Sequence, residues 1–145
     1  MTTVSYHQID AEESDYLYIK TSQLPHAGNG LYTAIAIYKD ERIAVFKGEK
    51  RTEKQAAAIA AKGQDQYFIV LPDGGILDSM PVFCFAKYAN DAAGPAKSNF
   101  KNNAVITLDD NDQVCLIALH TIKAGEEVFC AYGKCYWKKH SRLLL

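Results

Sequence analysis

The chain has 145 residues and a mass of 16.1 kDa, which is the size of one ordinary domain. Hydrophobic residues make up 48% and charged residues 23%, values typical of globular proteins, so a largely disordered chain is excluded. The 16 Lys and Arg residues against 17 Asp and Glu argue against direct binding of nucleic acid, because such proteins usually carry a basic excess.

The sequence carries no sign of a membrane span or a secretory leader. No apolar run approaches about 18 residues, and the first residues lack a basic segment followed by an apolar one. The four cysteines form no CxxC pair and are too few for a disulfide scaffold. We therefore expect a reduced, intracellular protein, in the nucleus or the cytoplasm, that folds as one domain over residues 1–145.

The first third of the chain is typical of short strands, because its apolar runs are brief and turn residues interrupt them. The sequence predicts strands over residues 16–19, 31–37 and 42–46. A segment rich in Gly, Pro and Asn separates the first two, and charged residues separate the second and third.

A helix is predicted after the third strand. Thr52 and Gln55 have the spacing of a capping box, in which each side chain accepts a hydrogen bond from the backbone N–H of the other residue. The alanine-rich stretch that follows continues to Lys62 and ends at Gly63, a residue type common just after a helix. A second, terminal helix is predicted from Tyr136 onward.

Two hairpins complete the predicted fold. Strands over residues 67–71 and 75–78 flank the turn sequence Pro-Asp-Gly at 72–74. Strands over residues 104–108 and 114–120 are apolar at successive positions, which predicts burial on both faces. The predicted fold class is mostly β, with many short strands, one inserted helix and one terminal helix.

Cysteine and histidine residues in the last third of the chain are candidate metal ligands. Cys115, His120, Cys130, Cys135 and His140 are spaced by five or ten residues, whereas structural zinc sites usually take ligand pairs about two to four residues apart. We therefore predict no metal site. Cys115 and Cys130 lie within apolar runs and are expected to behave as small buried hydrophobic groups. No cysteine has the basic or helix-N-terminal setting that activates a nucleophilic thiol.

Two polar segments have no obvious place in this fold. The Gly-Asn-Gly sequence at 28–30 is by itself typical of a β-turn, and the alternative is a backbone left open to a ligand. It lacks the third glycine and the following helix of a dinucleotide-binding site, which is excluded. The segment 85–95 is by itself typical of a surface loop, and Asn90 and Asp91 are expected to be too polar for the core.

Taken in order, these segments resemble the SET-domain family. The resemblance lies in five motifs: Gly28-Asn29-Gly30-Leu31-Tyr32; Phe46-Lys47-Gly48-Glu49; Tyr88-Ala89-Asn90-Asp91-Ala92; Asn102-Asn103; and Gly125-Glu126-Glu127-Val128 through Tyr132-Gly133 to Tyr136-Trp137. Each motif alone is weak, but their order and spacing match over about residues 17 to 140. The resemblance implies a single SET domain, in which small twisted sheets surround a pseudoknot.

The resemblance also implies an activity, which is methyl transfer from S-adenosyl-L-methionine to the ε-amine of a protein lysine. The substrate would be a histone tail or another protein, with no direct nucleic-acid partner and no membrane. The oligomeric state stays open, a dimer included. The number of methyl groups also stays open, because Cys130 stands where the family commonly has an aromatic residue.

The same resemblance implies the site residues. Tyr132 would hold the reacting centre with its hydroxyl. We do not expect it to act as a general base, because a phenol with a pKa of about 10 is a poor one. Tyr67 would supply a second hydroxyl in the lysine channel. Either Tyr136 or Trp137 would stack on the adenine. The residues implied in cofactor binding are Gly28, Asn29, Gly30, Asn90, Asp91, Tyr132, Tyr136 and Trp137.

Two departures from the family pattern leave an alternative open. Asp91 and Ala92 replace the usual His and Ser, and the zinc-binding cysteine clusters that flank many SET domains are absent from the sequence. The alternative is a catalytically weak SET-fold module that binds the cofactor or a lysine-bearing peptide. A purely structural β-domain would leave five ordered motifs unexplained.

Overall fold

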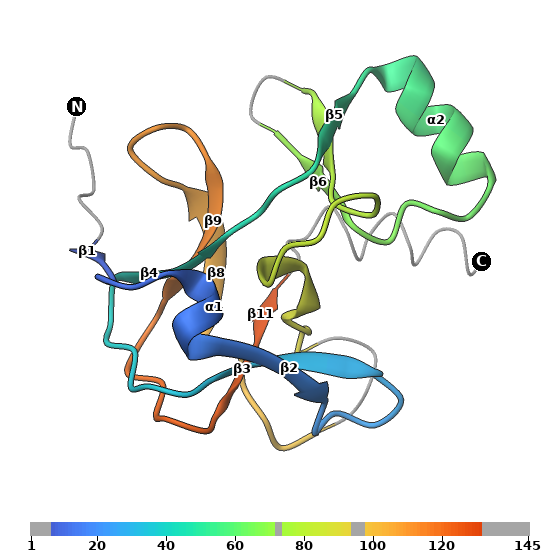
Figure 1. Ribbon diagram of the computed structural model, residues 1–145. Helices are drawn as coiled ribbons and strands as arrows, with labels where there is room; N and C mark the ends of the chain where they lie inside the picture. The colour runs from blue at the N-terminus through green and yellow to red at the C-terminus, as the bar shows by residue number, and fades with distance from the viewer. Residues whose placement is uncertain (1–6, 72–73, 94–97, 132–145) are drawn as a thin grey trace.

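The computed structural model describes residues 7–71, 74–93 and 98–131 (Figure 1). Short strands dominate these residues, and helices are few, so the mostly β fold class is confirmed. The elements in chain order are β1 (His7–Gln8), α1 (Glu13–Tyr16), β2 (Leu17–Thr21), β3 (Asn29–Thr33), β4 (Glu41–Val45), β5 (Glu49–Arg51), α2 (Glu53–Ala61), β6 (Phe68–Val70), β7 (Ile76–Asp78), the 3-10 turn η1 (Ala86–Tyr88), β8 (Ala104–Leu108), β9 (Val114–Ala118), β10 (Glu127–Val128) and β11 (Cys130–Ala131).

The strands of the described residues form three small sheets. The largest has the order β1-β4-β9-β8-β11, and the other two have the orders β10-β3-β2 and β5-β7-β6. Neighbouring strands are antiparallel except in the pairs β1–β4 and β11–β8, which are parallel. In Figure 1 the three sheets lie around a central region that contains β11 and η1. A site assembled in that region can therefore draw residues from all three sheets.

The hydrophobic core is centred on β9. All five of its residues are buried, as the apolar run predicted. Its hairpin partner β8 differs, because Val105 is 39% exposed and three further residues are only half-buried. The outer neighbour of β8 is the two-residue strand β11, so β8 has little cover on that side. The prediction of burial on both faces is correct for β9, which ends at Ala118, and wrong for the exposed residues 119 and 120 and for β8.

The first predicted strand begins one residue late, because a short helix precedes it. Glu12 and Asp15 form a capping box around the single turn of α1, and Tyr16 ends that helix instead of opening a strand. One turn of helix is too short to show a period in the sequence. The Tyr16 hydroxyl donates a hydrogen bond of 2.7 Å to the carbonyl of Ile43, which ties α1 to β4.

The predicted helix at Thr52 is confirmed as α2. The Thr52 hydroxyl accepts a hydrogen bond from the Gln55 N–H at 3.1 Å, and the Gln55 side chain accepts one from the Thr52 N–H at 3.0 Å. Gly63 follows the helix with a φ of +70°. The predicted helix from Tyr136 lies outside the described residues. Within the described part of the chain, the helices are too short or too polar to cross a membrane.

Replacing Thr52 by Ala should remove one hydrogen bond from the capping box of α2. We expect the free energy of unfolding to fall by about 1 kcal/mol, the usual effect of losing an N-cap hydroxyl. Urea denaturation followed by circular dichroism measures the change. Thr52→Ser is the control, because it keeps the hydroxyl, and an equal loss in both variants would contradict the capping role.

Candidate active site

The two segments predicted to bind cofactor lie next to each other in the structure. The Asn90 side chain donates a hydrogen bond from Nδ2 to the carbonyl of Asn29, at 2.9 Å and across 61 positions in the sequence. Residues 28–30 run from the loop into the start of β3, and Gly28 has a φ of +69°. The Gly28 carbonyl accepts a hydrogen bond of 2.8 Å from the N–H of Ser22, which closes this loop.

The backbone of Asn90 also meets the last described strand. Its carbonyl accepts a hydrogen bond of 2.9 Å from the Cys130 N–H, and Asn90 forms an isolated parallel bridge with Phe129. Ala131 is the last residue described before Tyr132. Tyr132, Tyr136 and Trp137 lie outside the described residues, so their assignment stays a prediction.

The second asparagine of the Asn102-Asn103 motif holds this strand from its other side. Asn103 is buried, and its Nδ2 donates to the carbonyl of Glu127 at 2.9 Å. The N–H of Phe129 donates to Asn103 Oδ1 at 2.8 Å. The side chain therefore replaces a backbone partner for a strand that has little regular pairing of its own.

Asp91 is buried, with 8% exposure, so the expectation that it is too polar for the core is wrong. Its Oδ1 accepts hydrogen bonds from the Ala93 N–H and from Asn102 Nδ2, both at 2.9 Å. Asn102 Oδ1 in turn accepts from the Ala92 N–H at 2.8 Å. A polar side chain can be buried when its hydrogen bonds are made, and these bonds stabilise the turn after Asn90. Contact between Asp91 and a cofactor stays a prediction.

Glu127 has a supporting role that was not predicted from the sequence. It is 2% exposed, and its carboxylate accepts hydrogen bonds from the Ser22 hydroxyl at 2.6 Å and from the Gln23 N–H at 2.8 Å. Gly30 packs directly against this carboxylate and leaves no room for a Cβ atom. The available signal was the place of Glu127 in the Gly125-Glu126-Glu127-Val128 motif, which does not indicate the contacts of the side chain. Glu127 thus holds the loop that leads to Gly28.

The Phe46-Lys47-Gly48-Glu49 motif joins β4 to β5 by close packing. Phe46 is buried, and a Cβ on Gly48 would collide with the backbone carbonyl of Asp78 on β7. Glu49 forms an ion pair of 2.9 Å with Arg51, which also contacts Asp78 at 3.2 Å. In this structure the motif supports the sheet that leads to Tyr67.

Tyr67 immediately precedes β6 and is half-buried. Burial raises the pKa of its hydroxyl, and the nearby Tyr88 and Cys84 raise it further. The group therefore stays protonated at neutral pH and can donate a hydrogen bond. The Nζ of Lys87, three residues before Asn90, lies 5.3 Å from the centre of the Tyr67 ring. The structure thus brings Tyr67 beside the segment that carries Asn90.

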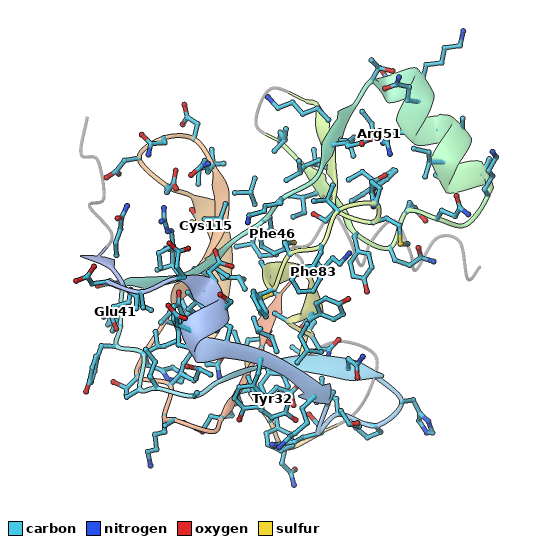
Figure 2. All side chains as sticks on the ribbon, in the orientation of Figure 1. Tyr32, Glu41, Phe46, Arg51, Phe83 and Cys115 are labelled. Atoms are coloured by element: carbon cyan, nitrogen blue, oxygen red, sulfur yellow. The ribbon has the colours of Figure 1, made fainter. Side chains whose placement is uncertain are left out.

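Phe83 adds a further aromatic ring to the group of aromatic side chains near Tyr67. Its ring packs edge-on against Phe85 at a centroid distance of 5.2 Å and lies 6.2 Å from the ring of Tyr88. Phe83 is 58% exposed. Figure 2 shows it between the sheet that carries Arg51 and the sheet that carries Tyr32.

The cysteines in the described part of the chain are buried free thiols, as predicted for two of them. Burial raises the pKa of Cys115 to about 11, with a further contribution from Asp109. Burial also raises the pKa of Cys130, and Asp91 adds to the effect. These two thiols are therefore poor nucleophiles at neutral pH.

In residues 7–71, 74–93 and 98–131, no three His, Cys, Asp or Glu side chains are grouped as metal ligands. Cys135 and His140 lie outside these ranges. The absence of a metal site stays a prediction.

Gly30→Ala should disturb the packing of Glu127 beneath the Gly28 loop. The new methyl group must displace a buried carboxylate or shift β3, and we expect unfolding free energy to fall by about 1–3 kcal/mol. The double variant Gly30→Ala/Glu127→Ala removes the collision. It should therefore be more stable than the sum of the single effects predicts, as measured by urea denaturation. Strictly additive effects would contradict direct packing between these residues.

The fold is similar to that of several solved structures. The structure described as ctPRC2 in an autoinhibited conformation bound to S-adenosylmethionine has a TM-score of 0.70 and 22% identity, and the match covers 89% of this chain and 16% of that one. A humanized mutant of the Chaetomium thermophilum Polycomb Repressive Complex 2 bound to the inhibitor GSK343 has a TM-score of 0.70, 24% identity and the same coverage. An active polycomb repressive complex 2 in the basal state has a TM-score of 0.68 and 24% identity, and the match covers 81% of this chain and 15% of that one.

These similarities concern the fold, and the chain spans about one sixth of the length of the matched chains. No curated protein sequence matches it. A family model described as the SET domain matches residues 28–133, which include all five motifs except the last pair, Tyr136-Trp137. Because this match covers well over half of the sequence, the protein belongs to the SET-domain family.

Proposed function

We propose that the protein is a protein-lysine N-methyltransferase that takes its methyl group from S-adenosyl-L-methionine. Members of the SET-domain family generally have this activity, and one structural neighbour is described as bound to this cofactor. The observation that carries the proposal is the hydrogen bond from Asn90 to the Asn29 carbonyl. It joins two segments to which the family resemblance assigns cofactor binding.

The described residues fit such a cofactor on their own geometry. Gly28 and Asn29 are exposed, and the space where a Gly28 side chain would stand is empty to 4 Å. Because Gly28 has no side chain, an amino acid moiety can approach the exposed backbone of residues 28 and 29 closely, although the two carbonyls there already accept hydrogen bonds from Ser22 and Asn90. We assign the backbone of residues 28–30 and the side chain of Asn90 to cofactor binding, with Asp91 supporting the turn. Either Tyr136 or Trp137 is assigned to stack on the adenine.

The cofactor would supply the methyl group on a positively charged sulfonium. A free lysine amine has a pKa of about 10.4, so only about one in a thousand is neutral and nucleophilic at pH 7. A dry aromatic channel disfavours the ammonium form and increases the neutral fraction. Tyr132 and Tyr67 are assigned to position the amine with their hydroxyls.

The proposed substrate is a lysine in a protein, with a histone tail as the first candidate. The alternative, a binding module without turnover, draws support from Asp91. The Asp91 carboxylate, which stands where the family usually has a histidine, accepts hydrogen bonds from Ala93 in its own turn and from the more distant Asn102. Measuring cofactor binding and methyl transfer separately distinguishes the two functions.

The first prediction of this proposal concerns the cofactor. Wild-type protein should bind S-adenosylmethionine or its demethylated product in calorimetry, and ligand at 100 times its Kd should stabilise the fold by about 2.7 kcal/mol. Asn90→Ala should weaken binding about tenfold or more, the equivalent of one lost hydrogen bond to the site. Asn111→Ala, in the exposed turn between β8 and β9, is the control. If the wild type shows no binding heat and no thermal shift with either ligand, cofactor binding is contradicted.

The second prediction concerns Tyr132. Tyr132→Phe removes one hydroxyl, and if that group acts in the transition state, kcat should fall about 100-fold or more while cofactor affinity changes little. The assay is transfer of a radiolabelled methyl group onto histones and a whole-cell lysate, with mass spectrometry of the labelled lysine.

Tyr18→Phe is the matched control, because Tyr18 lies on β2 and stacks on Tyr32 at 5.5 Å. Full turnover by Tyr132→Phe would show that the reacting centre is misplaced. Wild-type protein that binds cofactor and transfers no methyl group to any substrate would favour the binding module.

A further inference from the structure

Lys87 is a buried lysine at the centre of the fold. It belongs to η1 and is 8% exposed, although lysine is rarely buried unless its ammonium group is paired. Its Nζ donates hydrogen bonds to the carbonyls of Ser79 and Val82, each at 3.0 Å, and to that of Met80 at 3.4 Å. An ammonium group brings three donors, and here three backbone carbonyls of one loop converge on it. The loop 79–82 is therefore wrapped around a single charge.

The same ammonium group contacts Tyr67. It lies 5.3 Å from the centre of the Tyr67 ring and 5.7 Å from that of Tyr88, within the range of cation–π attraction. The loop also bonds to Tyr67 through the backbone, because the Ser79 N–H donates to the Tyr67 carbonyl at 3.2 Å. Tyr67 is thus connected to Lys87 through its ring and to the loop through its main chain.

The backbone of Lys87 connects to the other half of the site. The turn η1 closes with a hydrogen bond of 3.1 Å from the Ala89 N–H to the Ala86 carbonyl. Asn90 follows directly and bonds to Asn29 and Cys130. Lys87 therefore lies between Tyr67, assigned to the lysine side, and Asn90, assigned to the cofactor side.

We propose that Lys87 is a positioning residue for methyl transfer, which holds Tyr67 at a fixed place relative to Asn90. The inference rests on the proposed function. Methyl transfer requires the amine nitrogen, the methyl carbon and the sulfur to lie in line, and a misplacement of about 1 Å can slow such a reaction about 100-fold. The Lys87 ammonium group is bonded to three carbonyls and packed against two aromatic rings. These contacts restrict movement of Tyr67 relative to Asn90.

The test compares Lys87→Met, Lys87→Arg and the control Lys50→Met. Lys50 is an exposed residue of β5, so its replacement makes the same chemical change without a buried contact. We expect Lys87→Met to slow single-turnover methyl transfer about 10- to 100-fold, with cofactor Kd changed less than about threefold. Lys87→Arg keeps a positive charge and several donors, and should recover part of the rate. Lys50→Met should behave as the wild type.

Amide hydrogen exchange gives a readout that does not depend on activity. In Lys87→Met, exchange should become faster in residues 67–70 and 79–82 together, beyond any change in global stability. In wild-type protein, the amides of the two segments should show the same protection against hydrogen exchange. If Lys87→Met does not fold, the same exchange comparison is made between the wild type and Lys87→Arg, where we expect a smaller increase confined to these two segments.

Three results would overturn the role of Lys87. They are a Lys87→Met transfer rate equal to the wild type, a rate loss fully explained by the unfolded fraction, and independent exchange of the two segments. A wild-type protein that transfers no methyl group would instead refute the proposed function.

Discussion

The fold depends on one short segment, residues 127–130, that is bonded on both sides by parts of the chain far from it in sequence. Glu127 and Val128 pair with β3, and Cys130 pairs with β8. Between these pairs, Phe129 lies against the backbone of Asn90 and the side chain of Asn103. A strand of this length has too few hydrogen bonds to be stable alone. Its place between two sheets therefore depends on contacts with distant parts of the chain, among them the side-chain amide of the buried Asn103.

The same segment explains why the candidate site forms where it does. By bonding to Asn90, it brings the turn after η1 against β3, and by burying Glu127 it holds the loop before Gly28. Burying a carboxylate is costly unless its oxygens accept hydrogen bonds, and here a hydroxyl and a backbone N–H satisfy them. The proposed cofactor side of the site is thus organised by polar groups inside the protein, whereas the side proposed for the substrate lysine is organised by aromatic rings around Lys87.

Local features of the fold could be predicted from the sequence, and the partners of the site residues could not. The helix at Thr52 and the strand from Val114 follow from capping and apolar runs, which act between near neighbours. The burial of Asp91 and Lys87 depends on Asn102 and on the carbonyls of another loop, which no local pattern reveals. The site itself was found through family motifs, because each motif alone has an ordinary structural explanation.

The wide sequence spacing of these contacts also determines the order of assembly. Ser22 bonds to Glu127 across 105 positions, and Asn29 bonds to Asn90 across 61. Closing such large loops is slow, because the entropy lost on closure precedes the contacts that compensate for it. During synthesis on the ribosome, β2, β3 and α2 emerge well before their C-terminal partner. The loop before Gly28 therefore gains its buried anchor only after residue 127 has been translated.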